Sequence, residues 1–247
     1  QGSYFGLGIA VSGSEVAIAG YHRDLSTSGT FQDITSVFLL TSKSPLDGDS
    51  WDYSGSVVFD IELLSDEADP VCVAIGPNSY HVLYQAERDD STGIVRLGLF
   101  YAKGEQNTGI WSFQSAVGDH ASSAQMELLL NSDDEAVLVA AWREGSGDDA
   151  QLVSWVTDHM WSSENRLATS APGMEHLDLV KTEDGIQVFY DAVFLGTNVI
   201  LYGVLSDGDG SDSQSLSVRL SKGQLIDASR GDDGTNIVYL TSSEITS

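Results

Sequence analysis

Short runs of alternating apolar and polar residues, separated by turns rich in glycine, serine and aspartate, make up most of the chain. In Leu177–Tyr190 (LDLVKTEDGIQVFY), two such runs flank a Glu-Asp-Gly turn, and the second run ends on an aromatic residue. An Asp-Gly turn between two runs that favour β-structure is a strong signal of a β-hairpin. The pattern therefore predicts a hairpin over these residues.

This hairpin pattern occurs five times along the chain. The other copies are Ile9–Tyr21, Val73–Tyr84, Leu128–Trp142 and Ile226–Tyr239. The aromatic residues that close the five copies are separated by 63, 58, 48 and 49 residues. A repeat period of about 50 residues is typical of propellers and other repeat arrays.

Each hairpin is followed by further sequence that is typical of strands. A third β-rich run follows in the first four units, for example Ser36–Ser42 and Asn198–Gly208. A fourth segment opens with tryptophan at Trp51, Trp111 and Trp161, and the fourth unit has the alternating run Ser215–Leu220 instead. We find no convincing helix. Four-stranded units in tandem predict an all-β fold, a β-propeller of four-stranded blades, with a β-sandwich and an open array of meanders as alternatives.

The units predict one domain over residues 1–247, with a fifth blade that stops after its hairpin. The expected units are approximately 8–65, 71–120, 126–172, 177–222 and 225–247. A short last blade leaves an unpaired edge strand, which must be covered or paired to prevent aggregation. Three arrangements would achieve this: a ring that closes with a reduced last blade, further chain in a longer protein, or self-association with a partner chain that completes the blade.

The charge of the chain limits its partners. It has 37 acidic and 11 basic residues, a formal net charge of −26. This charge repels nucleic acids and anionic lipids, so we expect neither as a partner. No apolar run reaches the roughly 20 residues that span a bilayer, so we expect no membrane insertion. An acidic, aspartate-rich surface favours a secreted or cell-surface protein, although aspartate is also simply a good turn residue.

Two features bear on cofactors. The single cysteine, Cys72, lies in an apolar run and is expected to be a buried thiol, with no zinc spacing around it. Asp207, Asp209 and Asp212 resemble part of a calcium loop but lack its closing Glu. They are weak candidates for a calcium site, and a solvated turn is the alternative. We expect no other cofactor.

The chain resembles the propeller lectins of the fucose-binding and tectonin types, most clearly where LDLVKTEDGIQVFYDA is followed by NVILYGVLSDG in the fourth unit. It is less similar to sialidase-type propellers, because Leu46–Trp51 (LDGDSW) does not place its residues at the offsets of their Asp-box. The lectin resemblance implies a carbohydrate-binding propeller without catalysis. It also implies sites in which an Arg and a Glu accompany a stacking aromatic ring.

The residues that match these sites are the closing aromatics and the charged residues that follow them. An aromatic face beside a guanidinium and a carboxylate suits a sugar, because the ring stacks on C–H groups and the charges bond to hydroxyls. The alternative is packing between blades by the ring and a salt bridge between the charges. In the fourth unit Asp191 follows the aromatic and no Arg is present. The candidate ligand-binding residues are Tyr21, Arg23, Tyr84, Glu87, Arg88, Trp142, Arg143 and Glu144.

The sequence thus favours a lectin-like module that binds glycan. Two alternatives stay open. One is a glycoside hydrolase-type propeller, which needs two carboxylates flanking a glycosidic bond, and for which Asp24, Glu87 and Glu144 are the least arbitrary candidates. The other is a structural repeat domain of a larger surface or appendage protein. The five histidines are scattered without metal spacing, and the repeated tryptophans are expected to pack between blades.

Overall fold

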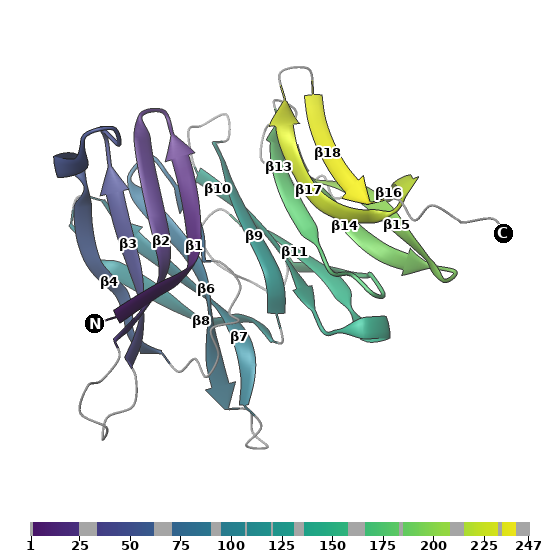
Figure 1. Ribbon diagram of the computed structural model, residues 1–247, viewed down its shortest axis with the longest axis horizontal. Helices are drawn as coiled ribbons and strands as arrows, with labels where there is room; N and C mark the ends of the chain where they lie inside the picture. Colours follow the sequence, from purple (N-terminus) through teal and green to yellow (C-terminus); the bar gives the residue numbers. More distant parts are fainter. Residues whose placement is uncertain are drawn as a thin grey trace. The chain divides into compact units, whose positions relative to one another are not determined.

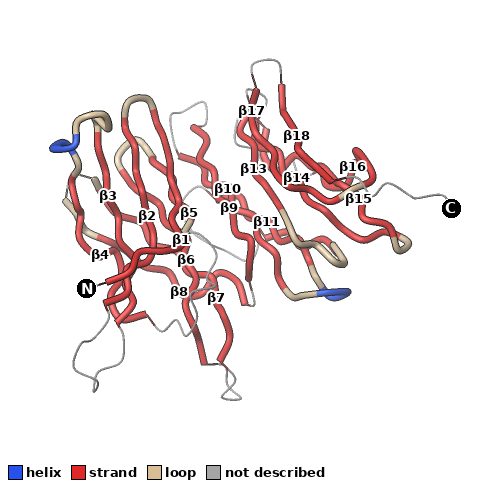
Figure 2. The backbone as a smooth tube through the Cα atoms, viewed as in Figure 1, coloured by secondary structure: helices blue, strands red, loops and turns tan. Residues whose placement is uncertain are grey.

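The computed structural model shows a chain built almost entirely of β-strands (Figure 2). The residues it describes are 2–24, 34–61, 71–89, 95–106, 108–119, 121–130, 136–157, 166–182, 185–207, 215–231 and 234–240. Among them the only helices are two short 3₁₀ turns, Gly48–Ser50 and Gly147–Asp149. No helix in this part of the chain is long and apolar enough to span a bilayer.

Within the described residues, the strands form four four-stranded antiparallel sheets and one two-stranded sheet, each with neighbouring strands in chain order (Figure 1). The first sheet contains β1 (Gly2–Ser12), β2 (Glu15–Asp24), β3 (Ile34–Ser42) and β4 (Asp52–Ile61). The second contains β5 (Cys72–Ile75), β6 (Ser79–Asp89), β7 (Val95–Glu105) and β8 (Trp111–Asp119). The third contains β9 (Ala121–Leu130), β10 (Ala136–Glu144), β11 (Gln151–Thr157) and β12 (Arg166–Ser170).

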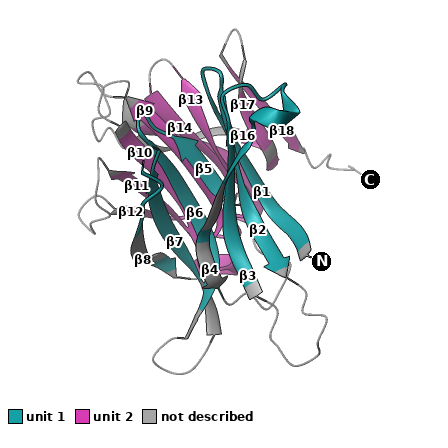
Figure 3. Ribbon diagram, turned by 90° about the vertical axis from the view of Figure 1, so that its left-hand side faces the viewer, with its two compact units in different colours: residues 1–121 teal, residues 122–247 magenta. Residues whose placement is uncertain are grey.

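The fourth sheet contains β13 (Leu177–Thr182), β14 (Gly185–Phe194), β15 (Thr197–Asp207) and β16 (Ser215–Lys222). The fifth contains β17 (Gln224–Gly231) and β18 (Gly234–Leu240). Four-stranded meanders of this kind are the blades of a β-propeller, so the predicted fold class is confirmed. The chain divides into two compact units, residues 1–121 and residues 122–247 (Figure 3).

The predicted hairpins pair as expected. In β13 and β14, Leu177 lies opposite Tyr190 and Thr182 lies opposite Gly185. In β1 and β2, Ile9 lies opposite Ile18, and the turn between them contains Gly13 with a φ of +59°. A left-handed backbone angle suits glycine because it has no Cβ to clash with the following carbonyl. Trp51 and Trp111 stand at the start of fourth strands, as predicted, and Trp161 lies outside the described residues.

In the first unit, the first and second sheets pack face to face. Their shared core includes Tyr21 and Leu39 from one sheet and Val73 and Tyr84 from the other. The hydroxyl of Tyr21 accepts a hydrogen bond from the backbone N–H of Gln85 (2.7 Å) and donates one to its carbonyl (3.2 Å). A buried hydroxyl needs such partners, because an unpaired one costs roughly 1–3 kcal/mol. The ring at the end of β2 therefore holds two blades together.

In the second unit, the fourth sheet is covered on both faces. Its residues Ile186, Val188 and Tyr190 pack against the third sheet, while Phe189 packs toward Leu225 of the fifth. A strand that is buried on both faces reads as a nearly continuous apolar run, which explains IQVFY in β14. In the fifth sheet, Tyr239 is 41% exposed, whereas the other four closing aromatics are at most 6% exposed. How this last blade is completed stays a prediction.

Candidate functional site

A cavity of about 370 Å³ lies in the first unit, at the end of the first two sheets where β1 turns into β2. Residues from both sheets form it: Glu15 at the start of β2, Asp52 at the start of β4, Tyr80 at the start of β6 and Trp111 at the start of β8. Lys43, Asp52 and Glu105 on its wall are exposed, so the cavity reaches solvent. Aromatic rings, carboxylates and hydroxyls thus converge between two blades.

Tyr80 and Glu15 join the two sheets across this cavity. The Tyr80 hydroxyl donates a 2.5 Å hydrogen bond to Glu15 Oε1. Burial, followed by this hydrogen bond, raises the pKa of Tyr80 to about 12. The nearby carboxylates of Glu15 and Asp52 contribute to this raised pKa, because they disfavour a phenolate, whereas a hydrogen bond with Thr41 lowers it. Tyr80 therefore stays protonated at neutral pH and acts as a hydrogen-bond donor rather than as a nucleophile.

Trp111 lies flat against the strand beside it. A Cβ built on Gly104, its partner in β7, would lie 2.7 Å from the six-membered ring of the indole. The ring can approach the backbone this closely only because residue 104 is glycine. Trp111 is half-buried and packs on the shared core, as the sequence predicts, but it also lines the cavity. A held aromatic ring beside carboxylates suits a sugar.

The structure does not form the aromatic sites that the sequence predicts. Tyr21 and Trp142 are fully buried and Tyr84 is 6% exposed, so their ring faces are not available to a ligand. Burial also raises the pKa of Tyr84 to about 12. The prediction that these rings stack on a sugar is corrected. Tyr21 and Tyr84 pack between the first two sheets, as the packing alternative proposes, and the ring of Trp142 is buried beside that of Trp155 in the same sheet.

Two of the charged candidates beside these rings, Arg23 and Glu144, contact residues of their own sheets. Arg23 donates from Nε to Thr35 Oγ1 (3.3 Å) and lies over the ring of Phe5, 5.3 Å from its centroid. Glu144 accepts a hydrogen bond from the indole N–H of Trp142 (3.1 Å). Glu87 is half-buried on β6, and the side chain of Arg88 lies outside the described residues. Because the ring of Trp142 is fully buried, its contact with Glu144 offers no open ring face to a sugar.

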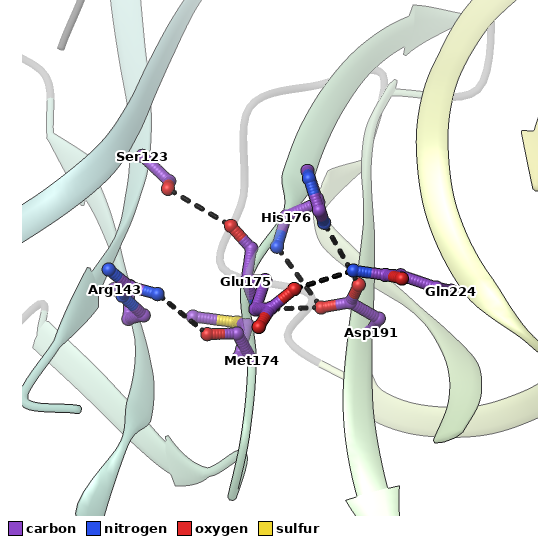
Figure 4. Close-up of polar contacts among 7 residues, drawn as sticks. All are labelled: Ser123, Arg143, Met174, Glu175, His176, Asp191 and Gln224. Atoms are coloured by element: carbon purple, nitrogen blue, oxygen red, sulfur yellow. Dashed lines mark hydrogen bonds and ion pairs between the residues drawn. The ribbon is translucent and has the colours of Figure 1, made fainter. Parts of the chain in front are cut away.

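Arg143 holds a loop. Its Nε donates to Ser122 Oγ (2.7 Å) and its Nη1 donates to the carbonyl of Met174 (2.8 Å), as Figure 4 shows for the second bond. Met174 lies in the connection between β12 and β13. The position after the closing aromatic is thus used here for anchoring a connection between blades, and the guanidinium has a structural role that the sequence did not predict.

Asp191 occupies the same position in the fourth unit and anchors the same loop from the other side (Figure 4). Its Oδ1 accepts hydrogen bonds from the backbone N–H groups of Glu175 (2.8 Å) and His176 (3.0 Å), and its Oδ2 lies 3.1 Å from His176 Nδ1. Asp191 is 3% exposed, while His176 is exposed. Glu175 also contacts Gln224 of β17 at 2.5 Å. Segment 174–176 is therefore held by three sheets.

A carboxyl group with an altered pKa lies close to this loop. Asp178 on β13 accepts a hydrogen bond from the backbone N–H of Ala228 on β17 (2.8 Å). Burial raises the pKa of Asp178 to about 6, and the carboxylate of Asp227 raises it while His176 lowers it. An acid with a pKa near the working pH can both give and take a proton. The sequence held no signal for this group, because its environment comes from two different sheets.

The metal prediction is not tested. Asp209 and Asp212, and the side chain of Asp207, lie outside the described residues. Within the described ranges, no group of three or more His, Cys, Asp or Glu side chains is placed to hold a metal ion. Asp24, named as a candidate carboxylate, also has its side chain outside them. Cys72, the single cysteine, is partly exposed rather than fully buried.

No protein-family model matches the chain, and no curated protein matches its sequence. Solved structures similar to it include Zg3597, a family 117 glycoside hydrolase of the marine bacterium Zobellia galactanivorans, with 10% identity over 89% of this chain and 70% of that chain and a TM-score of 0.48. A mannose phosphorylase from Leishmania mexicana matches with 11% identity over 97% and 80% and a TM-score of 0.47.

A thermostable family-43 glycoside hydrolase matches with 13% identity over 97% of this chain and 84% of that chain, also with a TM-score of 0.47. Because these TM-scores are below 0.5, the activities of these proteins say nothing about the activity of this chain. The fold is assigned from the four-stranded blades themselves.

Proposed function

We propose that the protein binds carbohydrate through the cavity between its first two sheets. The observation that supports this most is the convergence of Trp111, Tyr80 and several carboxylates in one open cavity of about 370 Å³. A sugar offers a C–H face for the indole and hydroxyls for the carboxylates, so both kinds of group would be used. The residues differ from those that the sequence predicts, but the ligand class is the same. A secreted or cell-surface location stays part of this proposal.

Trp111→Ala is expected to weaken glycan binding at least about tenfold, because loss of a stacking ring removes a central contact. Binding would be measured on a glycan array and then by calorimetry with each array hit. Lys43→Ala removes an exposed lining residue without touching the core and provides a second variant. Tyr53→Ala is the matched control for Trp111→Ala, since Tyr53 is an exposed aromatic residue of the same unit that does not line the cavity.

Equal affinity of wild type and both cavity variants would contradict the proposed site. Arg143→Ala separates this proposal from the sequence-based one. Because Arg143 anchors a loop in the second unit, we expect its variant to keep the glycan affinity of wild type. An array on which wild type binds no glycan would contradict the function itself.

The raised pKa of Asp178 supports a second candidate function, hydrolysis of a glycosidic bond. A carboxylic acid that keeps its proton to about pH 6 can donate it to a leaving oxygen, as one of the two carboxyl groups of glycosidases does. Asp227 is the nearby carboxylate that would act with it. This alternative places catalysis in the second unit and binding in the first, so separate variants test the two.

Asp178→Asn is expected to abolish hydrolysis of aryl glycosides while raising stability at neutral pH by about 1 kcal/mol, a figure reduced for solvent screening of a partly exposed group. In the folded state Asp178 keeps its proton up to about pH 6. In the unfolded state it loses the proton around its ordinary pKa of 3.8. The stability of wild type should therefore fall as pH rises through this interval, and that of the variant should not. Thermal unfolding from acid to neutral pH measures the second effect.

Wild type that cleaves none of a broad set of aryl glycosides would remove this second function. Asp148→Asn is the control, because Asp148 is an exposed turn aspartate of the same unit. Its variant should match wild type in both hydrolysis and the pH dependence of stability.

A further inference from the structure

The charges around the cavity of the first unit are unevenly distributed. Glu15, Asp52 and Glu105 bring three carboxylates to its wall, and Lys43 is the one basic side chain among the described lining residues. Two of these carboxylates already accept hydrogen bonds from the protein. Glu15 accepts one from the hydroxyl of Tyr80, and Glu105 Oε2 accepts one from Thr108 Oγ1 (3.0 Å). A hydrogen-bonded carboxylate keeps its negative charge, so the field in the cavity remains negative.

The lining hydroxyls make this cavity a formed polar site rather than an acidic surface patch. Thr41 and Ser42 are buried, and Ser42 Oγ lies 2.7 Å from Ser50 Oγ. Ser50 Oγ in turn donates to the carbonyl of Ser44 (2.6 Å). These bonds set the position of the 43–50 connection against the sheet. The opposite wall is formed by the ring of Trp111, which is held by its contact with Gly104.

A ligand for this cavity must suit both the ring and the charge. An anionic sugar, such as a uronic acid, would bring a carboxylate toward three others and would be repelled. A neutral sugar would stack on the ring and bond to the carboxylates through its hydroxyls, but it would gain no attraction between opposite charges. A protonated amino group would add attraction to the carboxylates, and a cation beside an indole face is favourable as well. Hydroxyls, a C–H face and a positive charge occur together in amino sugars.

We infer that this cavity selects glycans with free amino groups, of the 2-amino-2-deoxy type, over their N-acetylated and neutral counterparts. The inference rests on the proposed glycan-binding function and gives its ligand class. N-Acetylation removes the positive charge and leaves the ring of the sugar unchanged. Pairs of amino and N-acetyl oligosaccharides therefore isolate the contribution of the charge.

The test is calorimetric titration of the whole chain with tetramers of glucosamine, N-acetylglucosamine and glucose at about pH 6, where a sugar amine is protonated and carboxylates are ionised. We expect the glucosamine tetramer to bind at least about tenfold more tightly than the other two. This preference should shrink in about 1 M salt, which screens exposed charges within a few ångströms.

Asp52→Asn should reduce the preference about fivefold, the effect of one exposed charge at close range. Asp49→Asn is the matched control, because Asp49 is an exposed aspartate three residues away that does not line the cavity. A lysine tetrapeptide of equal charge controls for attraction to the acidic chain as a whole, and it should bind more weakly than the glucosamine tetramer.

The outcomes separate the inference from the function it rests on. The N-acetylglucosamine or glucose tetramer could bind as tightly as the glucosamine tetramer, or more tightly, and lose this binding in Trp111→Ala. That result would overturn the amino-sugar preference but support the proposed glycan-binding function. The inference would also be overturned if the preference for the glucosamine tetramer stays unchanged in both Trp111→Ala and Asp52→Asn. The same holds if the lysine tetrapeptide binds as tightly as the glucosamine tetramer. Absence of binding by all three tetramers and by the glycan array would contradict both.

Discussion

Asp191→Ala is expected to lower the free energy of unfolding by about 2 kcal/mol or more, because it leaves two backbone N–H groups that bond to a buried carboxylate without an acceptor. In the folded protein these N–H groups, of Glu175 and His176, point at Asp191 Oδ1. Alanine has no oxygen to replace it, and the side chain is too well enclosed for water to enter freely. Urea unfolding and amide hydrogen exchange at residues 175 and 176 measure the effect.

Asp191→Asn is the matched control. Asparagine keeps an acceptor oxygen for the two N–H groups and loses only the charge and the His176 ion pair. Because His176 is exposed, that pair contributes little, and the cost should stay below about 1 kcal/mol. If the alanine and asparagine variants unfold at the same urea concentration and exchange at the same rate, Asp191 does not hold segment 174–176 as the hydrogen bonds indicate.

Gly8→Ala is expected to destabilise the first unit by about 3 kcal/mol or more, the upper range for overpacking a core. A Cβ at Gly8 would lie 1.7 Å from the carbonyl oxygen of Val71. The obstacle is backbone, so no side-chain rotation relieves it. Strand β1 would have to move away from β5, with loss of the bond from Val71 N–H to the carbonyl of Gly6 (2.9 Å). Unfolding in urea, followed by tryptophan fluorescence, measures the loss.

Gly48→Ala is the control for this substitution. It adds the same methyl group in the same unit, but no atom lies within 4 Å of the new Cβ. Its effect should stay within about 0.5 kcal/mol of zero. A Gly8→Ala protein as stable as the Gly48→Ala protein would mean that the two strands are farther apart than the structure has them.

The blade pattern could be predicted because it depends on short-range signals. Alternation of apolar residues specifies a strand with one buried face, and an Asp-Gly or Ser-Gly turn specifies where the chain reverses. Both are readable in Leu177–Tyr190, and the pairing of Leu177 with Tyr190 follows from them. Repetition of this signal then predicted four-stranded blades in tandem.

The binding candidates could not be predicted in the same way. The sequence places an aromatic ring near the end of each second strand, with an arginine after it in the first three units, but does not say which face of the sheet is covered. Packing of the second sheet on the first buries Tyr21, and its hydroxyl bonds to Gln85. Trp142 is fully buried as well, with its ring beside that of Trp155 in the same sheet. A ring at a strand end looks the same in the sequence whether it meets a sugar or another blade.

The sequence by itself determined the strands, the repeat and the acidic surface, because each is a property of neighbouring residues or of composition. Only the tertiary structure decided where chemistry could occur. Glu15 and Tyr80 are 65 residues apart in the chain, yet they join across one cavity. Burial raises the pKa of Asp178, and the carboxylate of Asp227, about 50 residues later in the chain, raises it as well. Burial and electric field depend on which sheets pack together, and no local pattern encodes that.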